Sequence, residues 1–342
     1  AAVSSDGSWQ WVVQMGSAGV DTGDGIAVDP SGSKVYVTGT FEGTVAFGST
    51  TLTSAGFGDV FVGVLSGDGS WEWAVQGGGN ATDRGHAIAV DSSGTSYVTG
   101  HFRGSATFGS ATLVSAGAHE IFVGAVSSDG TWQWVVQAGG ASQDVGTDIA
   151  VDSSGTSYVT GYFQDTAVFG STTLTSAGHD DAFVGAVSSD GTWQWVVPAG
   201  GRGNDVASAV AIDSSGTSYV TGYFRGTATF GTFTLTTPDG TFDAFVGSVS
   251  SDGTWLWVVA SGGSSEARGR GIALDSSGTL LYVTGFFGAE GGTPTATFGA
   301  TTLTAAGWTD AFVAAMDSSG SWLWAPRAGG FTPGSDWGAV DE

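Results

Sequence analysis

One unit of about 61 residues recurs along the chain. The tetrapeptide Tyr-Val-Thr-Gly appears five times, and successive tyrosines are 61, 61, 61 and 63 residues apart. These tyrosines are Tyr36, Tyr97, Tyr158, Tyr219 and Tyr282. A constant period of this size indicates an array of equivalent units, so it has to be interpreted before local propensities. It favours one repetitive domain over two unrelated domains in a chain of 342 residues.

Each unit predicts short consecutive strands separated by tight turns. In the third unit the sequence Asp-Ser-Ser-Gly at 152–155 has the residue order of a type I turn. No segment shows the spacing of an amphipathic helix, and 60 glycines fit frequent turns, so almost no helix is expected. The expected strands of the third unit are 149–152, 157–163, a hairpin at 166–176, 182–187 and 192–197.

About four main strands per unit predict an all-β fold, a β-propeller with one blade per unit. A right-handed β-helix also fits the period, but Asp-Ser-Ser-Gly and Ser-Asp-Gly favour reversals between antiparallel neighbours. We therefore expect a single propeller domain over 1–342. Its units are predicted at 25–85, 86–146, 147–207, 208–269 and 270–336, with partial copies at 1–24 and 337–342.

The residues of the unit also match a known pattern. One run of the chain contains Gly139-Gly140, Asp144, Gly146, Ile149-Ala150-Val151-Asp152, Ser154-Gly155, Tyr158-Val159-Thr160-Gly161 and Asp181-Ala182-Phe183-Val184. This order resembles the bacterial SBBP-type β-propeller repeat, and the resemblance extends over five units. It implies a propeller of a secreted or cell-surface protein without catalytic activity. The last copy departs from the pattern, because Ala325-Pro326-Arg327 replaces the usual Val-Val-Gln.

The two ends of the chain repeat each other. Residues 1–29 and 314–341 both run through Trp-x-Trp to Ala-Val-Asp. Since a closed ring needs only one copy of these outer strands, one copy is surplus. The surplus strands could build part of a sixth blade, could belong to a longer array, or could pair with a neighbouring molecule in a homo-oligomer or filament.

Net charge and amino-acid composition limit the kinds of partner that the chain can bind. The chain has 32 acidic and eight basic residues and a formal net charge of −24, which repels nucleic acids and anionic membranes. No run approaches the roughly 18 apolar residues of a membrane span, so no membrane insertion is expected. There is no cysteine, which excludes disulfides and cysteine-based zinc sites. The start at Ala1 is consistent with a removed leader or with a cut inside a longer array, and we expect an extracellular or cell-surface location.

Aspartates recur four times in a glycine-rich loop that comes before the first strand of a unit. They precede the first-strand aspartate by eight residues and are Asp21, Asp83, Asp144 and Asp205. Carboxylates converging on one rim could bind Ca²⁺, which takes six to eight oxygen ligands. The alternative is that they cap turns through hydrogen bonds to backbone N–H groups. Ca²⁺ is the only cofactor that the sequence suggests.

A second set of acids lies just before the Phe-Val strand of every unit. Its members are Asp59, Glu120, Asp181, Asp243 and Asp310. Two of them have a nearby histidine, His119 or His179, and such pairs can bind transition metals or act in acid–base chemistry. Because the other three units carry Gly58, Phe242 and Thr309 at that place, loop variation is the simpler explanation.

Twelve of the 14 tryptophans lie in Trp-x-Trp pairs. Alternation along a strand predicts both indoles of a pair on one face, either stacking on sugar rings or packing between blades. Trp308 and Trp337 lie outside the pairs and are the candidate glycan-binding residues. Asn80 heads the single N-glycosylation sequon.

No catalytic residue is predicted, because no hydrolase, zinc-peptidase or nucleotide motif occurs. The expected function is a non-enzymatic extracellular scaffold with structural or adhesive use, self-assembling through its surplus strands. The alternative is a lectin-like propeller that binds surface glycans at repeated sites, with or without Ca²⁺.

Overall fold

The computed structural model describes residues 1–289 and 293–330, which form antiparallel four-stranded meanders. The first meander consists of β3 (Thr22–Val28), β4 (Lys34–Phe47), β5 (Thr50–Ser66) and β6 (Trp71–Gly79). The second consists of β7 (Arg84–Val90), β8 (Ser96–Phe108), β9 (Ala111–Val126) and β10 (Trp132–Gly140). The third consists of β11 (Val145–Val151), β12 (Ser157–Phe169), β13 (Thr172–Val187) and β14 (Trp193–Gly201).

Two further meanders carry their outer hairpin as separate strands. The fourth has β15 (Val206–Ile212), β16 (Ser218–Arg225), β19 (Phe242–Val249) and β20 (Trp255–Ala260), with the hairpin β17 (Thr227–Phe230) and β18 (Phe233–Thr236). The fifth has β22 (Glu266–Leu274), β23 (Leu280–Gly288), β26 (Thr309–Asp317), β27 (Trp322–Trp324) and β28 (Arg327–Ala328), with the hairpin β24 (Thr295–Phe298) and β25 (Thr301–Thr304). The short strands β1 (Ala2–Val3), β2 (Trp9–Trp11) and β21 (Gly262–Gly263) complete the set.

The all-β prediction is confirmed in the described residues, where the single helical element is the 3₁₀ turn η1 (Pro238–Gly240). The predicted turns are also present. The Asp152 carbonyl accepts a hydrogen bond from Gly155 N–H at 3.1 Å, and Gly155 has a φ of +82°, which glycine adopts without strain. The predicted unit boundaries fall inside the first strands, since the third meander begins at Val145 and not at 147.

Successive meanders are joined by backbone hydrogen bonds. The last residues of β14 pair with the hairpin of the fourth meander, Ala199 with Phe230 and Gly201 with Ala228. The same connection runs from β6 to β8, from β10 to β12 and from β21 to β24. The strands β6, β10 and β14 therefore each pair both within their own meander and with the next one, which holds these neighbouring meanders in one orientation.

The core lies between neighbouring meanders. One cluster combines Tyr158 and Val184 of the third meander with Val210 and Phe230 of the fourth, and all four are at most 5% exposed. Equivalent clusters occur at the other junctions. Each meander thus buries both of its faces only if it has a neighbour on both sides.

The prediction that both indoles of a Trp-x-Trp pair share a face is wrong. Trp132 pairs with Val126 while Trp134 pairs with Ala125, so a bulge lies between them and reverses the alternation. Trp132 donates its Nε1–H to the Gln76 carbonyl of the preceding meander at 3.0 Å. Trp134 donates to the Ser189 carbonyl of the following meander at 2.8 Å. The two indoles of this pair therefore contact the preceding and the following meander. This supports packing between blades over stacking on sugar rings.

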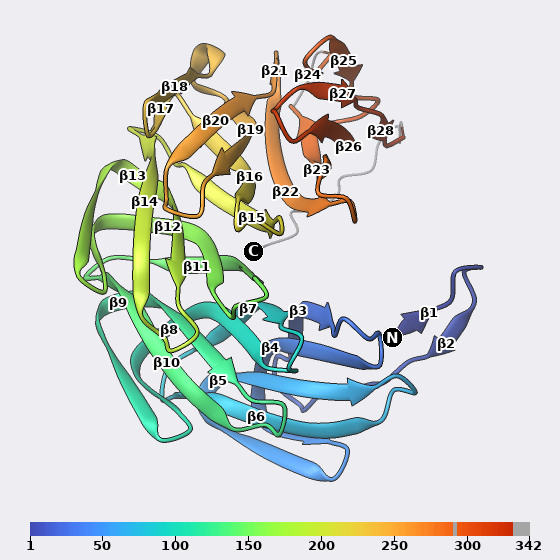
Figure 1. Cartoon of the computed structure of the whole chain (residues 1–342), viewed down its shortest axis with the longest axis vertical. Coiled ribbons are helices and arrows are strands. Elements are labelled where there is room, and N and C mark those ends of the chain that lie inside the picture. The colour runs from blue at the N-terminus through green and yellow to red at the C-terminus, as the bar shows by residue number, and fades with distance from the viewer. Residues whose placement is uncertain (290–292, 331–342) are drawn as a thin grey trace.

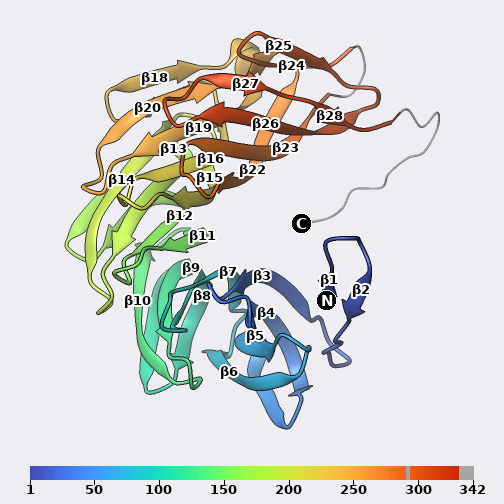
Figure 2. The same ribbon diagram turned by 45° about the vertical axis from the view of Figure 1, so that its right-hand side comes forward.

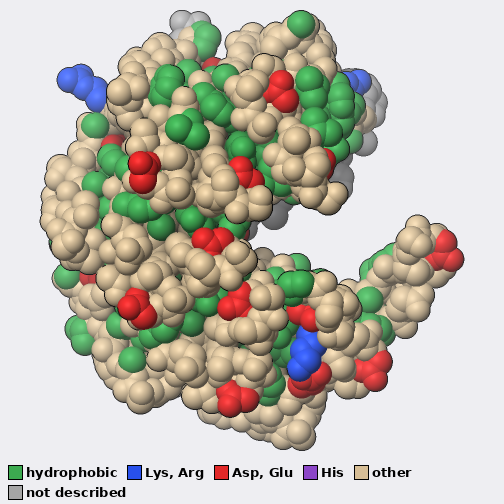
Figure 3. Space-filling model, in the orientation of Figure 1, with side chains coloured by type: hydrophobic (Ala, Val, Ile, Leu, Met, Phe, Trp, Pro, Cys, Tyr) green, Lys and Arg blue, Asp and Glu red, His purple; other side chains and the backbone are tan. Residues whose placement is uncertain are grey.

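The meanders form an open arc with their first strands on the inner side (Figures 1 and 2). The first and fifth meanders are separated by a gap, which also remains when side chains are drawn (Figure 3). Within the described residues β1 pairs with β2 alone, and β27 and β28 pair with β26 alone. Among residues 1–289 and 293–330, no strand of the first meander pairs with a strand of the fifth. None of its described helices is long and apolar enough to cross a membrane.

Candidate functional site

The loop aspartates fasten three segments of backbone together. Asp144 is fully buried, and its carboxylate accepts hydrogen bonds from Gly140 N–H at 2.7 Å and Gln164 N–H at 3.2 Å. Its own N–H donates to the His119 carbonyl at 2.9 Å. Asp83 and Asp205 make the equivalent carboxylate contacts, and the half-buried Asp21 accepts from Ser17 and Glu42. Hydrogen bonds of this kind are expected of aspartates that cap turns, which was the alternative to Ca²⁺ binding.

Burial dominates the electrostatics of these aspartates. It raises the pKa of Asp83, Asp144 and Asp205 to about 7 against the effect of their hydrogen bonds, and the nearby acid of the second set raises each pKa further. No three His, Asp or Glu side chains within residues 1–289 and 293–330 are grouped as metal ligands would be. Ca²⁺ binding by these aspartates stays a prediction.

The second set of acids is buried with part of its hydrogen-bonding capacity unused. Asp181 accepts a hydrogen bond from Ala177 N–H at 3.0 Å through Oδ2, but its Oδ1 has no partner. Burial raises the pKa of Asp59, Asp181 and Asp243 to about 6. In the fifth meander Asp310 instead pairs with Arg327, at 2.7 Å between Oδ2 and Nη1. These acids cost stability when ionised unless a cation lies beside them.

Three histidines gather in the second meander. His86 Nε2 and His101 Nδ1 are 2.9 Å apart, and the rings of His101 and His119 are centred 4.5 Å apart. Burial lowers the pKa of all three, that of His101 to about 2, and neighbouring histidines and arginines lower it further. The sequence prediction treated His119 as loop variation and did not use His86 or His101, whereas the strand register brings the three together.

Arginine and aromatic side chains gather at the corresponding place of the fourth and fifth meanders. The Arg268 guanidinium lies 4.5 Å from the ring centre of Tyr223 and 4.4 Å from that of Phe242. Arg270 lies 5.4 Å from the ring centre of Phe286. The Arg268 guanidinium also pairs with Glu266, at 2.5 Å between Nη2 and Oε1, so the stack and the ion pair together orient it. Sequence reasoning missed this cluster as well, although the strand equivalences could have revealed it.

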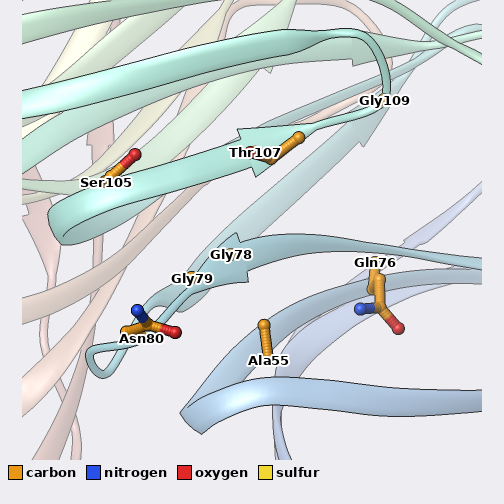
Figure 4. Close-up of a pocket in the computed structure, with 8 residues that line it drawn as sticks. All are labelled: Ala55, Gln76, Gly78, Gly79, Asn80, Ser105, Thr107 and Gly109. Atoms are coloured by element: carbon orange, nitrogen blue, oxygen red, sulfur yellow. The ribbon is translucent and has the colours of Figure 1, made fainter.

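A groove between the outer hairpins occurs at two equivalent junctions. Between the first and second meanders its volume is about 550 Å³, and it is lined by Ala55, Gln76, Gly78, Gly79, Asn80, Ser105, Thr107 and Gly109 (Figure 4). Between the third and fourth its volume is about 560 Å³, and Ala177, Pro198, Gly200, Thr229 and Gly231 take the matching places. This groove therefore follows the repeat and provides no single asymmetric pocket.

The remaining candidates lie apart from one another. Trp308 is 58% exposed just before β26, at the position that Phe57 occupies in the first meander. Trp337 lies outside the described residues. Asn80 is exposed in the loop between β6 and β7, and its glycosylation stays a prediction.

Comparison with known proteins supports the repeat assignment. The SBBP β-propeller repeat matches residues 10–40 and 133–162, which run from a fourth strand into the first two strands of the next meander. The chain is also 24% identical over 270 residues to an uncharacterised WD repeat-containing protein of Acanthamoeba polyphaga mimivirus. That match covers 65% of this chain and 19% of the viral protein, so the chain spans about a fifth of this relative.

The matched segments coincide with the part of the unit that carries the loop aspartate, the first strand and Tyr-Val-Thr-Gly. The remaining units repeat Tyr-Val-Thr-Gly in the same strand, and all but the fifth keep the loop aspartate. The two matches show that the chain contains β-propeller repeats of the SBBP type.

Proposed function

We propose that this protein is a non-enzymatic, extracellular structural scaffold that associates head to tail with a second copy of itself. The supporting observation is apolar surface at both ends of the arc. At each end, residues whose equivalents are buried between meanders remain exposed.

The fifth meander exposes the face that would meet a following meander. Tyr282 and Val313 are 37% and 38% exposed, whereas their equivalents Tyr158 and Val184 are 3% and 1% exposed. Trp324 is 44% exposed and donates its indole N–H to no described residue, whereas Trp257 donates to the Ser318 carbonyl. This face is a junction surface without its partner.

The first meander exposes the complementary face. Ile26 and Val28 are 64% and 54% exposed, while the equivalent Ile149 is 4% exposed and packs in a cluster with Tyr97 of the preceding meander. The exposed face of the fifth meander and that of the first are therefore equivalent to the two faces that pack together at each internal junction. Because the two faces differ, they form a heterologous contact that propagates into a filament or closes into a ring of several copies.

The N-terminal strands partly occupy this junction. Trp11 of β2 donates its indole N–H to the Gly67 carbonyl at 2.8 Å, just as Trp73 donates to the Ser128 carbonyl. The strand β27 of a second copy would need the same place. Removal of residues 1–14 is therefore expected to strengthen association.

Sedimentation over a range of concentrations and negative-stain imaging test the proposal. Val313→Ser and Ile26→Ser each remove apolar contact area and are expected to weaken association by roughly tenfold or more. Val114→Ser is the matched control, because Val114 is 63% exposed on β9 away from both ends. A wild-type monomer at high concentration, an equal effect of Val114→Ser, or loss of association on removing residues 1–14 would each reject face-to-face assembly.

A further inference from the structure

Six positions of the unit change from repeat to repeat while the framework around them stays nearly constant. In the second meander they are Arg84, His86, His101, Arg103, Ala118 and His119. Strand register makes these equivalent to Val206, Ser208, Tyr223, Arg225, Thr241 and Phe242 in the fourth. In the fifth they are Arg268, Arg270, Phe286, Gly288, Trp308 and Thr309. We call this set the variable positions.

The variable positions hold side chains that are scarce elsewhere. They include all four histidines of the chain, three in the second unit and His179 in the third. The chain has eight basic residues, of which Lys34 is the one lysine, and five of its seven arginines occupy variable positions. A scaffold requirement would repeat in every unit, so differences concentrated at one place indicate contact with something outside the scaffold.

The fold brings the variable positions to one end of the strands. Arg84 lies opposite His101 across β7 and β8, and Arg103 lies opposite His119 across β8 and β9. Neighbouring units contribute to the same surface, since Arg268 of the fifth lies over Tyr223 of the fourth. The variable positions therefore lie together at one rim of the arc, where Arg84, Arg103 and Arg225 are exposed and others such as His101 are buried.

A hollow of about 330 Å³ opens in this surface at the junction of the first and second meanders. Its lining is Phe57, Asn80, Ala81, Thr82, Arg103 and His119. Phe57 is 68% exposed, and Arg103 is exposed and makes no ion pair with any described residue. The buried Asp83 accepts the Arg103 backbone N–H at 3.0 Å, which fixes the base of this arginine.

We propose that this hollow binds a hexuronic acid residue of an acidic saccharide. The Arg103 guanidinium has the planar geometry to hold a carboxylate with two hydrogen bonds. The Phe57 ring offers an apolar face to the pyranose. The Asn80 amide, the Thr82 hydroxyl and the His119 imidazole are donors and acceptors suited to sugar hydroxyls.

The charge of the protein limits the class of anion. A net charge of −24 repels densely charged polyanions, so a ligand with one carboxylate per sugar is favoured over a polyphosphate. Burial and the nearby Arg103 and Arg84 lower the pKa of His119, so its imidazole is neutral at pH 7. Arg103 then supplies the positive charge of the hollow.

This inference does not depend on head-to-tail assembly.

Calorimetry at low ionic strength with galacturonic acid trisaccharide tests the proposal. Its methyl ester, which keeps the sugar and removes the charge, is expected to bind at least tenfold more weakly. Arg103→Gln copies Gln164, the residue of the third unit, and is expected to weaken binding of the acid roughly tenfold to a hundredfold. Phe57→Ala copies Ala118 and is expected to weaken binding roughly threefold to tenfold.

Lys34→Gln is the charge-matched control, because Lys34 lies outside the hollow and pairs with Glu72. Unchanged binding of this variant, with the losses above, supports the proposal. Equal binding of acid and ester, or equal losses in Lys34→Gln and Arg103→Gln, would overturn it. Inorganic sulfate binding as tightly as the trisaccharide, with no effect of Phe57→Ala, would reduce the hollow to a simple anion site and also overturn it.

Discussion

The third and fifth meanders are built from the same unit but are held differently. The third packs between two neighbours, and its Asp144 links the β10 end to β12. In the fifth the equivalent residue is Ala267, also fully buried. Its strand β22 begins earlier, so that Glu266 pairs with Gly288, and the loop N–H groups of Ser264 and Ser265 donate to the Thr295 carbonyl. The unit tolerates loss of its aspartate where other backbone bonds replace it.

The comparison separates two requirements of the repeat. Strand pairing and the buried phenylalanines are present in both meanders, as Phe183 and Phe312 show with 0% and 1% exposure. The contacts of Tyr158 and Val184 with a following meander have no counterpart in the fifth meander, and neither has the capping aspartate. Strand pairing and the buried phenylalanines are therefore properties of every unit. The capping and junction contacts differ with the position of the unit in the arc.

Exchange of the capping residue should give the largest effect. Asp144→Ala leaves the partly buried N–H groups of Gly140 and Gln164 without their carboxylate partner and is expected to cost about 2–5 kcal/mol of unfolding free energy. Ala267→Asp is also expected to destabilise, because the fifth meander buries the new carboxylate without the donors that Asp144 has. Urea unfolding measures both.

Asp165→Asn serves as the control for this exchange. Asp165 is exposed, and asparagine tolerates its φ of +54°, so the change should stay within about 0.5 kcal/mol. A stable Asp144→Ala protein would mean that the capping contacts are dispensable in the third meander too.

Neutralising the second acid should act in opposite directions in the two meanders. Asp181→Asn removes a buried charge and is expected to stabilise by about 1–2 kcal/mol at pH 8. Asp310→Asn removes the partner of Arg327 and is expected to destabilise slightly, by up to about 1 kcal/mol. Thermal melts at pH 4 and pH 8 distinguish the two variants.

The pH dependence follows from the raised pKa of Asp181. Its folded value of about 6 lies above the ordinary 3.8, so the native state keeps a proton that the unfolded chain has lost between these pH values. Stability therefore falls as pH rises through this window, and the cost is complete above pH 6. Asp181→Asn should match the wild type near pH 4 and exceed it at pH 8. An equal gain at both pH values would assign the effect to packing.

The smallest effect concerns the indole hydrogen bonds. Trp134→Phe removes the bond to the Ser189 carbonyl and is expected to cost about 1 kcal/mol. Trp324→Phe, at the equivalent position of the fifth meander, is expected to change the unfolding free energy of the monomer by less than about 0.5 kcal/mol. Similar costs at both positions would show that the free end is covered in solution.

Much of the fold follows from local sequence. The turn at Asp152 and the strand containing Tyr158 were predictable, because turn chemistry and side-chain alternation act within a few residues. The bulge between Trp132 and Trp134 was not, since it depends on register with β9. The open arc was not either, because the angle at which packed sheets meet is not encoded in one unit.

The site was less predictable. The contacts of Asp144 match one of the two interpretations that its spacing allowed. His86 and His101 are 15 residues apart and come together only through strand pairing, so they form no recognisable motif in the sequence. Comparing the units position by position supplies the missing signal, since it separates residues that every unit needs from residues that one unit has.

The shared fourth strands have a mechanical consequence. When the arc is pulled along its length, tension passes between meanders through backbone hydrogen bonds as well as through apolar contacts. The joint of the fourth meander to the third has three paired residues, whereas the fifth is attached by two, Gly262 with Thr297 and Gly263 with Ala296. The fifth meander should therefore detach first under load, while the rest of the arc keeps its curvature and its rim stays intact.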